Sequence, residues 1–157
     1  MSNSPREWQS GEPILCVAGR SLIDEAAAIM LAQLSTAHGL PARHEPAGSL
    51  TATTVARLET TGVAIVCLVY MDASGPAHMR YSVRRLRRKL PKATIILGCW
   101  MKDMDPAALE QLRDSANADL VAASLGQALD FFIESAGTHS RSHITTKQDE
   151  ASAVSAA

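Results

Sequence analysis

The sequence predicts a three-layer α/β fold around a parallel sheet, and three observations support this class. Short apolar runs alternate with longer segments of helical periodicity along most of the chain. Several of these runs carry no charged residue, as is typical of strands that are covered on both faces. Prolines and glycines separate many of the segments. Because each strand is followed by a helix, neighbouring strands pair in parallel, and right-handed crossovers place helices on both sides of the sheet.

Five segments have the composition of strands. Three of them are continuous apolar runs: PILCVAG (13–19), VAIVCLVYM (63–71) and ATIILGCW (93–100). The segment LPARHEP (40–46) contains two prolines, which predict a strand at an edge of the sheet. The segment ADLVAAS (118–124) is the last strand. The connections predict the strand order 2-1-3-4-5, as in flavodoxin-like and Rossmann-like folds.

Five further segments predict helices, of which the first two follow the first two strands. The segment 22–38 predicts an amphipathic helix that stops before Gly39. Its apolar residues at helical spacing are Ile23, Ala26, Ala27, Met30, Leu31 and Leu34. The segment 49–62 predicts a short helix, which ends at Gly62. Its apolar residues are Leu50, Val55 and Leu58.

The other three helices have clearer boundaries. The segment 75–91 carries apolar residues at spacings of four, three and four, which predict one buried face. These residues are Met79, Val83, Leu86 and Leu90. The helix at 105–115 begins with Asp105 as its cap and Pro106 in its first turn. The segment 124–137 predicts the last helix. We expect a flexible leader over 1–12, the α/β domain over 13–136 and a disordered tail over 137–157.

The composition is that of one soluble domain. The 157 residues are enough to bury a core of their own, and 46% of them are hydrophobic. Only 4% are aromatic, so the core is predicted to be aliphatic. No apolar run approaches the roughly 20 residues that cross a bilayer, and the polar start does not resemble a signal peptide. We therefore expect a cytoplasmic protein, and its Met1 leader favours a free-standing chain.

The three cysteines, Cys16, Cys67 and Cys99, each lie inside a predicted strand. Their odd number and the absence of paired spacing predict buried free thiols in a reducing compartment. Because the first, third and fourth strands are predicted to lie near one another, three thiolates for zinc or copper are an alternative. No C-x-x-C spacing supports a metal site, so the sequence favours cysteine as a small buried apolar residue.

Candidate functional residues follow the strands, because sites in such folds lie beyond the carboxyl ends of the strands. The turn after the first strand has Gly19 alone, where a dinucleotide site needs three glycines. Ser21 and Asp24 are typical of a helix cap, which is the favoured interpretation. An anion bound near Ser21 and Arg20 is the alternative. A phosphate-accepting receiver domain is disfavoured, because Asp72 is the only matching carboxylate.

Catalysis finds little support in the sequence. Ser74 and His78 lie near each other beyond the third strand, which suggests a small hydrolase as one alternative. The segment DASGPAHM is equally typical of a loop and a helix start, where Gly75 and Pro76 turn the chain. No carboxylate is evidently placed to orient His78. We therefore expect a protein that is not an enzyme.

The third predicted helix is strongly basic. Seven cations and no acid occur between Arg80 and Lys92, whereas the rest of the chain has eight cations and sixteen acids. The candidate partner contacts are Arg80, Arg84, Arg85, Arg87 and Arg88. Such a face attracts an acidic protein or an anionic membrane surface. The few aromatic residues disfavour nucleic acid. A solvated face that is balanced by acidic neighbours is the alternative.

Three stretches carry a resemblance to a known family. They are ILCVAGRSLIDEAAAIMLAQLSTAHG, GVAIVCLVYMDASGPAHMRYSVRRLRRKLP and TIILGCW. Over about residues 13–136 the chain resembles the cytosolic domain of bacterial transporters of the autoinducer-2 exporter family, which is itself similar to the cobalamin-binding fold. The resemblance implies a five-stranded Rossmann-like domain with a regulatory role beside a transporter.

The same resemblance implies how a corrinoid would bind. Domains that ligate cobalt from below use D-x-H-x-x-G after the first strand, and the matching positions here are Ser21, Ile23 and Ala26. Isoleucine has no imidazole nitrogen for cobalt. Cys99 and Trp100 stand where such domains have paired glycines that admit the nucleotide tail. The resemblance therefore implies no resident cofactor, with cobalamin bound only without histidine ligation.

Together these observations predict a non-catalytic regulatory or interaction module that acts through the carboxyl-edge cleft, the basic helix or both. The alternative is a sensor of a corrinoid or nucleotide. Candidate ligand contacts are Gly19, Arg20, Ser21, Tyr70, Asp72, Ser74 and Trp100. Expected partners are an acidic protein face or the anionic inner membrane surface, with which the protein associates peripherally, a small-molecule ligand, and a second copy of the chain. No metal ligands are predicted.

Overall fold

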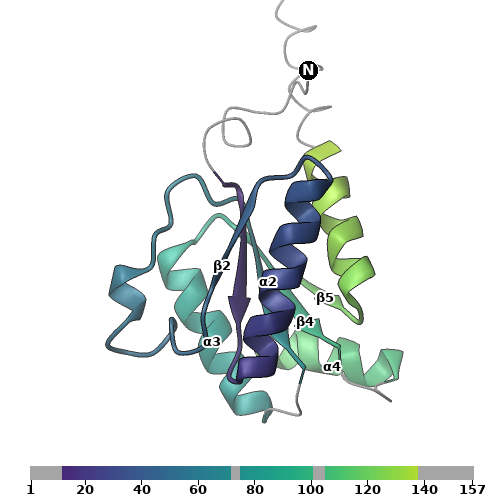
Figure 1. The fold of residues 1–157 in the computed structure, drawn as a ribbon. Helices are drawn as coiled ribbons and strands as arrows, with labels where there is room; N and C mark the ends of the chain where they lie inside the picture. The colour runs from purple at the N-terminus through teal and green to yellow at the C-terminus, as the bar shows by residue number, and fades with distance from the viewer. Residues whose placement is uncertain (1–11, 72–74, 101–104, 138–157) are drawn as a thin grey trace, which may run out of the picture.

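Five strands form one parallel sheet in the order β2-β1-β3-β4-β5 (Figure 1). The structure is a computed structural model, and it describes residues 12–71, 75–100 and 105–137. The strands are β1 (Ile14–Ala18), β2 (Ala42–Glu45), β3 (Ile65–Tyr70), β4 (Thr94–Cys99) and β5 (Leu120–Ala122). The predicted order and the flavodoxin-like class are confirmed, and β2 lies at an edge of the sheet as its prolines indicate.

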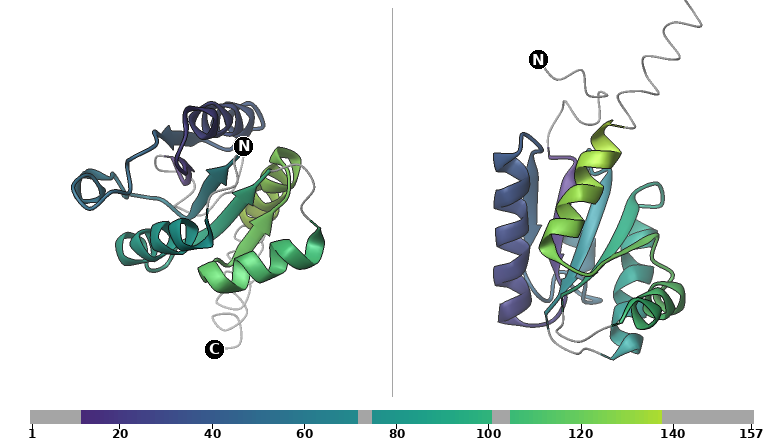
Figure 2. Two further views of the ribbon diagram at one scale, coloured as in Figure 1. Left: turned by 90° about the horizontal axis from the view of Figure 1, so that it is seen from below. Right: turned by 90° about the vertical axis from the view of Figure 1, so that its right-hand side faces the viewer.

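Helices cover both faces of the sheet (Figure 2). They are α2 (Leu22–Ala37), α3 (Pro76–Lys89), α4 (Pro106–Ala116) and a further helix over residues 125–137. The helices α3 and α4 pack on one face, whereas α2 and the helix over 125–137 pack on the other. Asp105 caps α4 as predicted, and its side chain accepts a hydrogen bond from the backbone N–H of Ala108.

The core has two halves because side chains alternate across each strand. In β4, Ile95 and Leu97 point toward α3 and α4, whereas Ile96 points toward α2 and the helix over 125–137. These three side chains are fully buried. Burial of each stabilises the fold by about 1.5–3 kcal/mol, which explains why the apolar runs predict the sheet so well.

The segment 49–62 is where the predicted helix is wrong. It contains turns and one short 3-10 helix, η1 (Val55–Arg57), in place of an α-helix. Threonine and serine side chains bind backbone groups here and compete with helical hydrogen bonds. The Thr54 hydroxyl donates to the carbonyl of Gly48, and Ser49 donates to Pro46 at 2.7 Å. Two of the three apolar residues that the sequence analysis named in this segment, Leu50 and Leu58, are nevertheless buried.

The buried face of α2 also differs from the expected apolar pattern. Two of its buried residues are larger, Asp24 and Leu31. The others are small: Ala27, Ala28, Ala32 and Ser35. Larger apolar residues of the same helix, Ile23 and Met30, are 56% and 60% exposed. Alanines let the helix lie close to the sheet, so the larger side chains are left on the outer face. The expected amphipathic helix is therefore present, with its apolar residues divided between two faces.

None of the helices in the described part of the chain has both the length and the apolar character needed to span a membrane.

Candidate functional site

The turn between β1 and α2 is organised by a carboxylate of the chain itself. Oδ2 of Asp24 accepts hydrogen bonds from the backbone N–H groups of Arg20 at 2.8 Å and Ser21 at 2.9 Å. In return the Ser21 hydroxyl accepts from the backbone N–H of Asp24 at 3.2 Å. This reciprocal arrangement is a capping box, so the capping interpretation of the sequence is confirmed.

The other oxygen of Asp24 reaches the next strand of the sheet. Oδ1 accepts from the backbone N–H of Met71 at 2.6 Å, just beyond the end of β3. Asp24 is fully buried, and its carboxylate satisfies backbone donors from two loops. Two of these donors, the N–H groups of Arg20 and Ser21, lie in the turn that leads into α2, and the third follows β3. The carboxyl group of Asp24 therefore fills this part of the turn.

Gly19 is required by an aromatic ring. A Cβ atom at this position would lie 2.4 Å from Cε1 of Tyr70, which is closer than packed atoms allow. The Tyr70 side chain is fully buried, and its hydroxyl hydrogen-bonds to Nδ1 of His78 at 2.9 Å. The same hydroxyl lies 3.4 Å from Oγ of Ser82, to which it donates. Burial raises the pKa of Tyr70 to about 12, so this phenol is neutral and serves as a hydrogen-bonding group.

A cleft of about 230 Å³ opens beside this hydrogen-bonded group. It is lined by Gly19, Arg20, Gly48, Leu50, Thr51, His78, Tyr81 and Ser82. Three segments that are distant in sequence meet here, at the carboxyl edge of the sheet. The pKa of His78 is lowered by burial and by the positive charge of Arg20, while Asp24 acts in the opposite direction. Because the lining contains a cation and no acid, the cleft favours small anionic ligands.

The residues predicted to contact a ligand differ in their position relative to the cleft. Gly19 and Arg20 line the cleft. Tyr70 lies buried beside it, whereas Ser21 is used as the helix cap. Asp72 and Ser74 lie outside the described residues. The sequence did not indicate Leu50, Thr51, Tyr81 and Ser82 as lining residues, because the segment that carries the first two was assigned to a helix.

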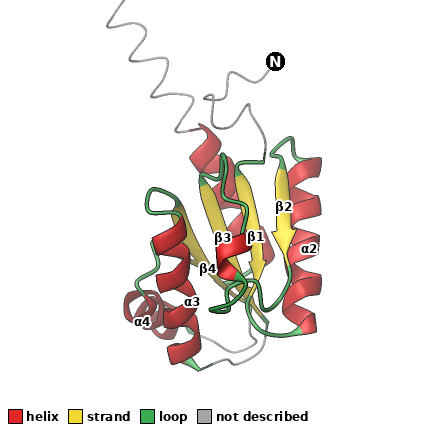
Figure 3. Cartoon of the chain, turned by 90° about the vertical axis from the view of Figure 1, so that its left-hand side faces the viewer, coloured by secondary structure: helices red, strands yellow, loops and turns green. Residues whose placement is uncertain are grey.

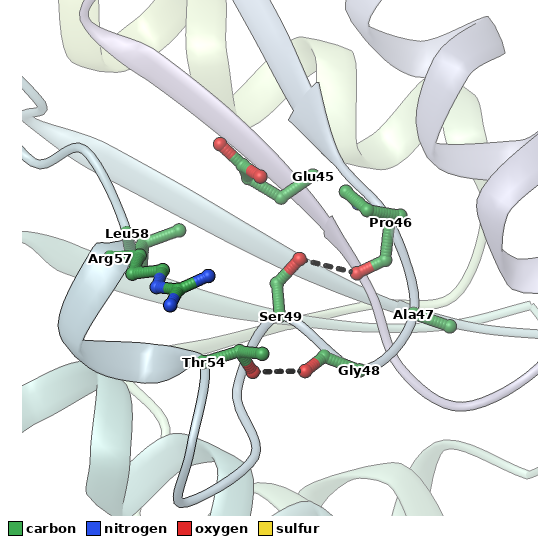
Figure 4. A pocket seen from close by; sticks show the side chains of 8 residues that line it. All are labelled: Glu45, Pro46, Ala47, Gly48, Ser49, Thr54, Arg57 and Leu58. Atoms are coloured by element: carbon green, nitrogen blue, oxygen red, sulfur yellow. Dashed lines mark hydrogen bonds between the residues drawn. The ribbon is translucent and has the colours of Figure 1, made fainter.

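A larger depression of about 480 Å³, which also includes Gly48, lies beyond the end of β2 (Figure 4). Its lining residues are Glu45, Pro46, Ala47, Gly48, Ser49, Thr54, Arg57 and Leu58. Side-chain hydrogen bonds to the carbonyls of Pro46 and Gly48 hold its wall in place, as Figure 4 shows. The charges of Glu45 and Arg57 are opposite in sign, so this depression has no single polarity. The sequence did not indicate this depression, because residues 49–62 were assigned to a helix.

Trp100 closes the opposite face of the carboxyl edge. Its ring packs against the half of the core under α2 and the helix over 125–137. Its indole Nε1 is buried and has no hydrogen-bond partner among the described residues. The preceding Gly98 leaves no open slot, since an added Cβ would lie 3.4 Å from Sγ of Cys67 and 3.5 Å from Trp100. The position at which paired glycines would admit a nucleotide tail is therefore packed with side chains.

These contacts test the fit of a corrinoid ligated from below. The position of the ligating histidine is occupied by Ile23, which has no nitrogen and points into solvent. Trp100 fills the space beside the sheet. His78 lines the cleft at the carboxyl edge, and its Nδ1 is bound to Tyr70. The described residues do not fit that mode of binding.

The basic helix α3 uses some of its cations inside the protein. Nη1 of Arg85 donates to the carbonyl of Leu50 at 2.8 Å, and its guanidinium lies 3.9 Å from the centre of the Tyr81 ring. Arg87 donates to the carbonyl of Asn117 at 2.8 Å and forms an ion pair with Asp119 at 3.1 Å. Lys89 donates to a backbone carbonyl of η1. These cations fasten α3 to the segments beside it.

Three other arginines of α3 are exposed: Arg80, Arg84 and Arg88. They recur every four residues and so lie along one face of the helix. None of them forms an ion pair within the described residues. Together with Arg87 they line a groove of about 390 Å³ against the end of α4. We call Arg80, Arg84 and Arg88 the arginine stripe.

The cysteines do not converge. Cys16 and Cys67 are neighbours in the β1–β3 register and face α2, whereas Cys99 belongs to the core on the other side of the sheet. All three are buried free thiols, as predicted. Burial raises the pKa of each, to about 12 for Cys99, so they are protonated. The described residues contain no group of three or more side chains arranged to hold a metal ion.

No protein-family model matches the chain, and no curated protein matches it in sequence. Among solved structures, the chain is similar to the 1.5 Å crystal structure of a novel cobalamin-binding protein from Desulfitobacterium hafniense DCB-2. The TM-score is 0.57 at 13% sequence identity. The match covers 78% of this chain and 58% of the other, so it spans less than two thirds of that protein. At this identity the likeness concerns the fold.

Proposed function

We propose that this chain is a non-catalytic interaction module that binds an anionic partner through the arginine stripe of α3. The observation that carries the proposal is the exposure of Arg80, Arg84 and Arg88 on one helix face without acidic partners in the described residues. Guanidinium groups bind carboxylates and phosphates in bidentate geometry, so a row of them selects anionic surfaces. The stripe lies beside a groove that gives it a defined shape.

The partner in this proposal is the anionic inner surface of a membrane, or the acidic face of a protein beside it such as a transporter. A surface of anionic lipid attracts each nearby cation by about 1 kcal/mol, so three arginines give reversible peripheral binding. The protein would then act in the cytoplasm. Nucleic acid is disfavoured, because the exposed aromatic ring beside the stripe, that of Tyr81, stacks with Arg85, which leaves few rings for base stacking.

Vesicle binding at different salt concentrations tests this function. We expect the chain to sediment with vesicles that contain phosphatidylserine, to ignore neutral phosphatidylcholine vesicles, and to dissociate as salt screens the charges. The variant Arg84→Gln/Arg88→Gln should lose most of the binding. The control Arg57→Gln/Lys92→Gln removes the same charge from exposed positions elsewhere and should bind normally.

The same variants also distinguish the partner classes. If the chain does not bind vesicles but binds an immobilised acidic peptide, and the Arg84→Gln/Arg88→Gln variant loses that binding, the partner is a protein. If binding is independent of lipid charge and salt, or equal in both double variants, the proposal is wrong.

A second candidate is a small-molecule sensor that uses the carboxyl-edge cleft. It is supported by the convergence of Arg20 and His78 on a cleft of about 230 Å³. The likeness in fold to a cobalamin-binding protein makes a corrinoid the first ligand to test. In this candidate a corrinoid binds without histidine ligation, and no cofactor is resident. Equilibrium dialysis of cobalamin against the protein tests this candidate, because binding without histidine ligation keeps the axial ligands of cobalt and so leaves the visible spectrum largely unchanged. Retention of cobalamin no greater than in a protein-free control removes the corrinoid version. A nucleotide is the other ligand class in this candidate.

A hydrolase is the third possibility, and the lack of a carboxylate hydrogen-bonded to His78 among the described residues argues against it. A serine hydrolase orients its histidine with a carboxylate at one ring nitrogen and uses the other nitrogen as the base. Nδ1 of His78 is bound by the Tyr70 hydroxyl, and Asp24 spends its oxygens on backbone N–H groups. We expect no turnover of activated esters above background. Turnover that disappears in His78→Ala would contradict a non-catalytic role.

A further inference from the structure

The outer face of α2 carries a regular row of exposed, uncharged residues. The row is spaced at three, four, three and four residues along the helix, and we call it the α2 seam. It consists of Ile23, Ala26, Met30, Gln33 and Ala37, all of which are exposed. A repeat that averages three and a half residues is typical of helices that pack lengthwise against another helix. The sheet does not explain this row, because α2 faces the sheet with other residues.

Large apolar side chains are concentrated at this face. Five large apolar residues of the described chain are exposed, and three of them belong to α2. These three are Leu22, Ile23 and Met30. The outer face of a helix in a monomer is normally polar or charged. Apolar residues gathered on one exposed face indicate an interaction surface.

We propose that the α2 seam pairs with the α2 seam of a second copy of this chain, related by a twofold axis. In a twofold dimer the same patch occurs on both sides of the interface, so it must be complementary to itself. The α2 seam satisfies this condition because none of its residues carries a charge. Gln33 adds to it, because its amide has both donors and acceptors and is able to hydrogen-bond with a copy of itself.

The other helices of the chain do not meet the same condition. The arginine stripe of α3 would repel its own copy. The exposed residues of α4 include Glu110 and Asp114, and those of the helix over 125–137 include Asp130 and Glu134. A charged partner therefore has better surfaces on this molecule than α2. The neutral seam is the face on which a second copy packs without opposed like charges.

The seam also lies away from the arginine stripe. Helices α2 and α3 cover opposite faces of the sheet, as Figure 3 shows. Pairing through α2 therefore leaves both stripes of a dimer accessible. The pairing does not depend on the function proposed above, because the α2 seam and the arginine stripe are separate surfaces on opposite faces of the sheet.

Sedimentation velocity of the full chain over a series of concentrations tests the pairing. A single helix pair buries less than the roughly 1,200 Å² of standard interfaces, so we expect a monomer–dimer equilibrium in the micromolar range. The variant Met30→Glu places two carboxylates in the interface and should be monomeric at every concentration. Ile133→Glu is the matched control, because Ile133 is 45% exposed on another helix of the same face, and this variant should dimerise normally.

The folding of the variants and the identity of the segments that meet in the dimer are checked separately. Met30 is exposed, so Met30→Glu should keep the circular dichroism spectrum and melting temperature of the parent chain; Ile23→Gln, a milder second variant, should weaken the dimer without abolishing it. A bismaleimide cross-linker should join two copies of Ala26→Cys and spare Ile133→Cys, since the native thiols are buried. A monomeric parent chain, a dimer unaffected by Met30→Glu, or a cross-link from Ala26→Cys to another segment of the same chain would overturn the proposal.

Discussion

The carboxylate of Asp24 accepts a hydrogen bond from the backbone N–H of Met71 at 2.6 Å, although 47 positions separate the two residues. This contact joins the turn after β1 to the end of β3, which is the neighbouring strand in the sheet. The same side chain binds the N–H groups of Arg20 and Ser21. One buried aspartate thus ties the turn that lines the carboxyl-edge cleft to the end of β3.

Asp24→Asn should destabilise the protein by about 2–3 kcal/mol, because an amide nitrogen replaces one acceptor and faces backbone donors. The measurement is chemical denaturation followed by circular dichroism. Asp130→Asn is the control, since Asp130 is exposed on the helix over 125–137 and should change stability by less than about 0.5 kcal/mol. Equal effects in both variants would show that Asp24 does not organise the turn.

Gly19→Ala should cost about 1–3 kcal/mol, because the new methyl group meets the Tyr70 ring. Gly75→Ala is the comparison, since its Cβ would meet no atom within 4 Å. Combining Gly19→Ala with Tyr70→Leu should recover part of the loss if the clash is the cause. A double variant whose losses simply add would assign the cost of Gly19→Ala to the backbone.

Arg20→Gln should raise the pKa of His78 toward the ordinary histidine value of 6.5, because a nearby cation disfavours the imidazolium. The recovery should be partial, since burial is the larger cause of the lowered pKa. The readout is the chemical shift of the His78 ring proton as the pH is changed. Arg84→Gln removes an equal charge from the outer face of α3 and should leave this titration unchanged.

The same pKa predicts a pH dependence of stability. The folded protein binds a proton at His78 less tightly than the unfolded chain does, so this contribution is complete above pH 6.5 and is lost as the pH falls below that value. His78→Gln should therefore show a weaker loss of stability on acidification between pH 7 and 5. An unchanged slope would contradict the lowered pKa.

Arg87→Gln and Arg88→Gln should differ although the residues are adjacent. Arg87 binds Asn117 and Asp119 and so ties α3 to the turn before β5. Its loss should cost about 1 kcal/mol, as expected for a partly exposed charged hydrogen bond. Arg88 is exposed, and its replacement should leave stability unchanged while it weakens vesicle binding. A reversed order of the two effects would overturn the division of the basic residues into internal and external groups.

The apolar runs determined the sheet. Ile14–Ala18, Ile65–Tyr70 and Thr94–Cys99 are buried almost throughout, so their hydrophobic content carries the information on strand position. The strand order follows because strand–helix alternation admits few connections. The capping box at Ser21 and Asp24 was also legible, since it depends on residues three positions apart.

Tertiary structure determined the conformation of residues 45–58 and which face of α2 is buried. Local threonine and serine hydrogen bonds replaced the expected helix, and Arg85 reached the carbonyl of Leu50 from a distant helix. In α2, apolar residues at positions such as Ile23 and Leu31 have the same pattern in sequence, yet only Leu31 meets the sheet. Periodicity shows that a helix has an apolar surface, but the strands it packs against select which part is buried.

The sequence by itself determined the fold class, the strand order, the buried thiols and the basic character of α3. Only the tertiary structure decided that Asp24 fills the turn after β1, that His78 is held by Tyr70, and which arginines of α3 face solvent. The physical reason is the separation in sequence between the residues that form each feature. The apolar runs and the capping box consist of residues close together in the sequence, whereas the cleft and the arginine stripe depend on contacts between distant segments, such as Asp24 with Met71 and Arg87 with Asp119.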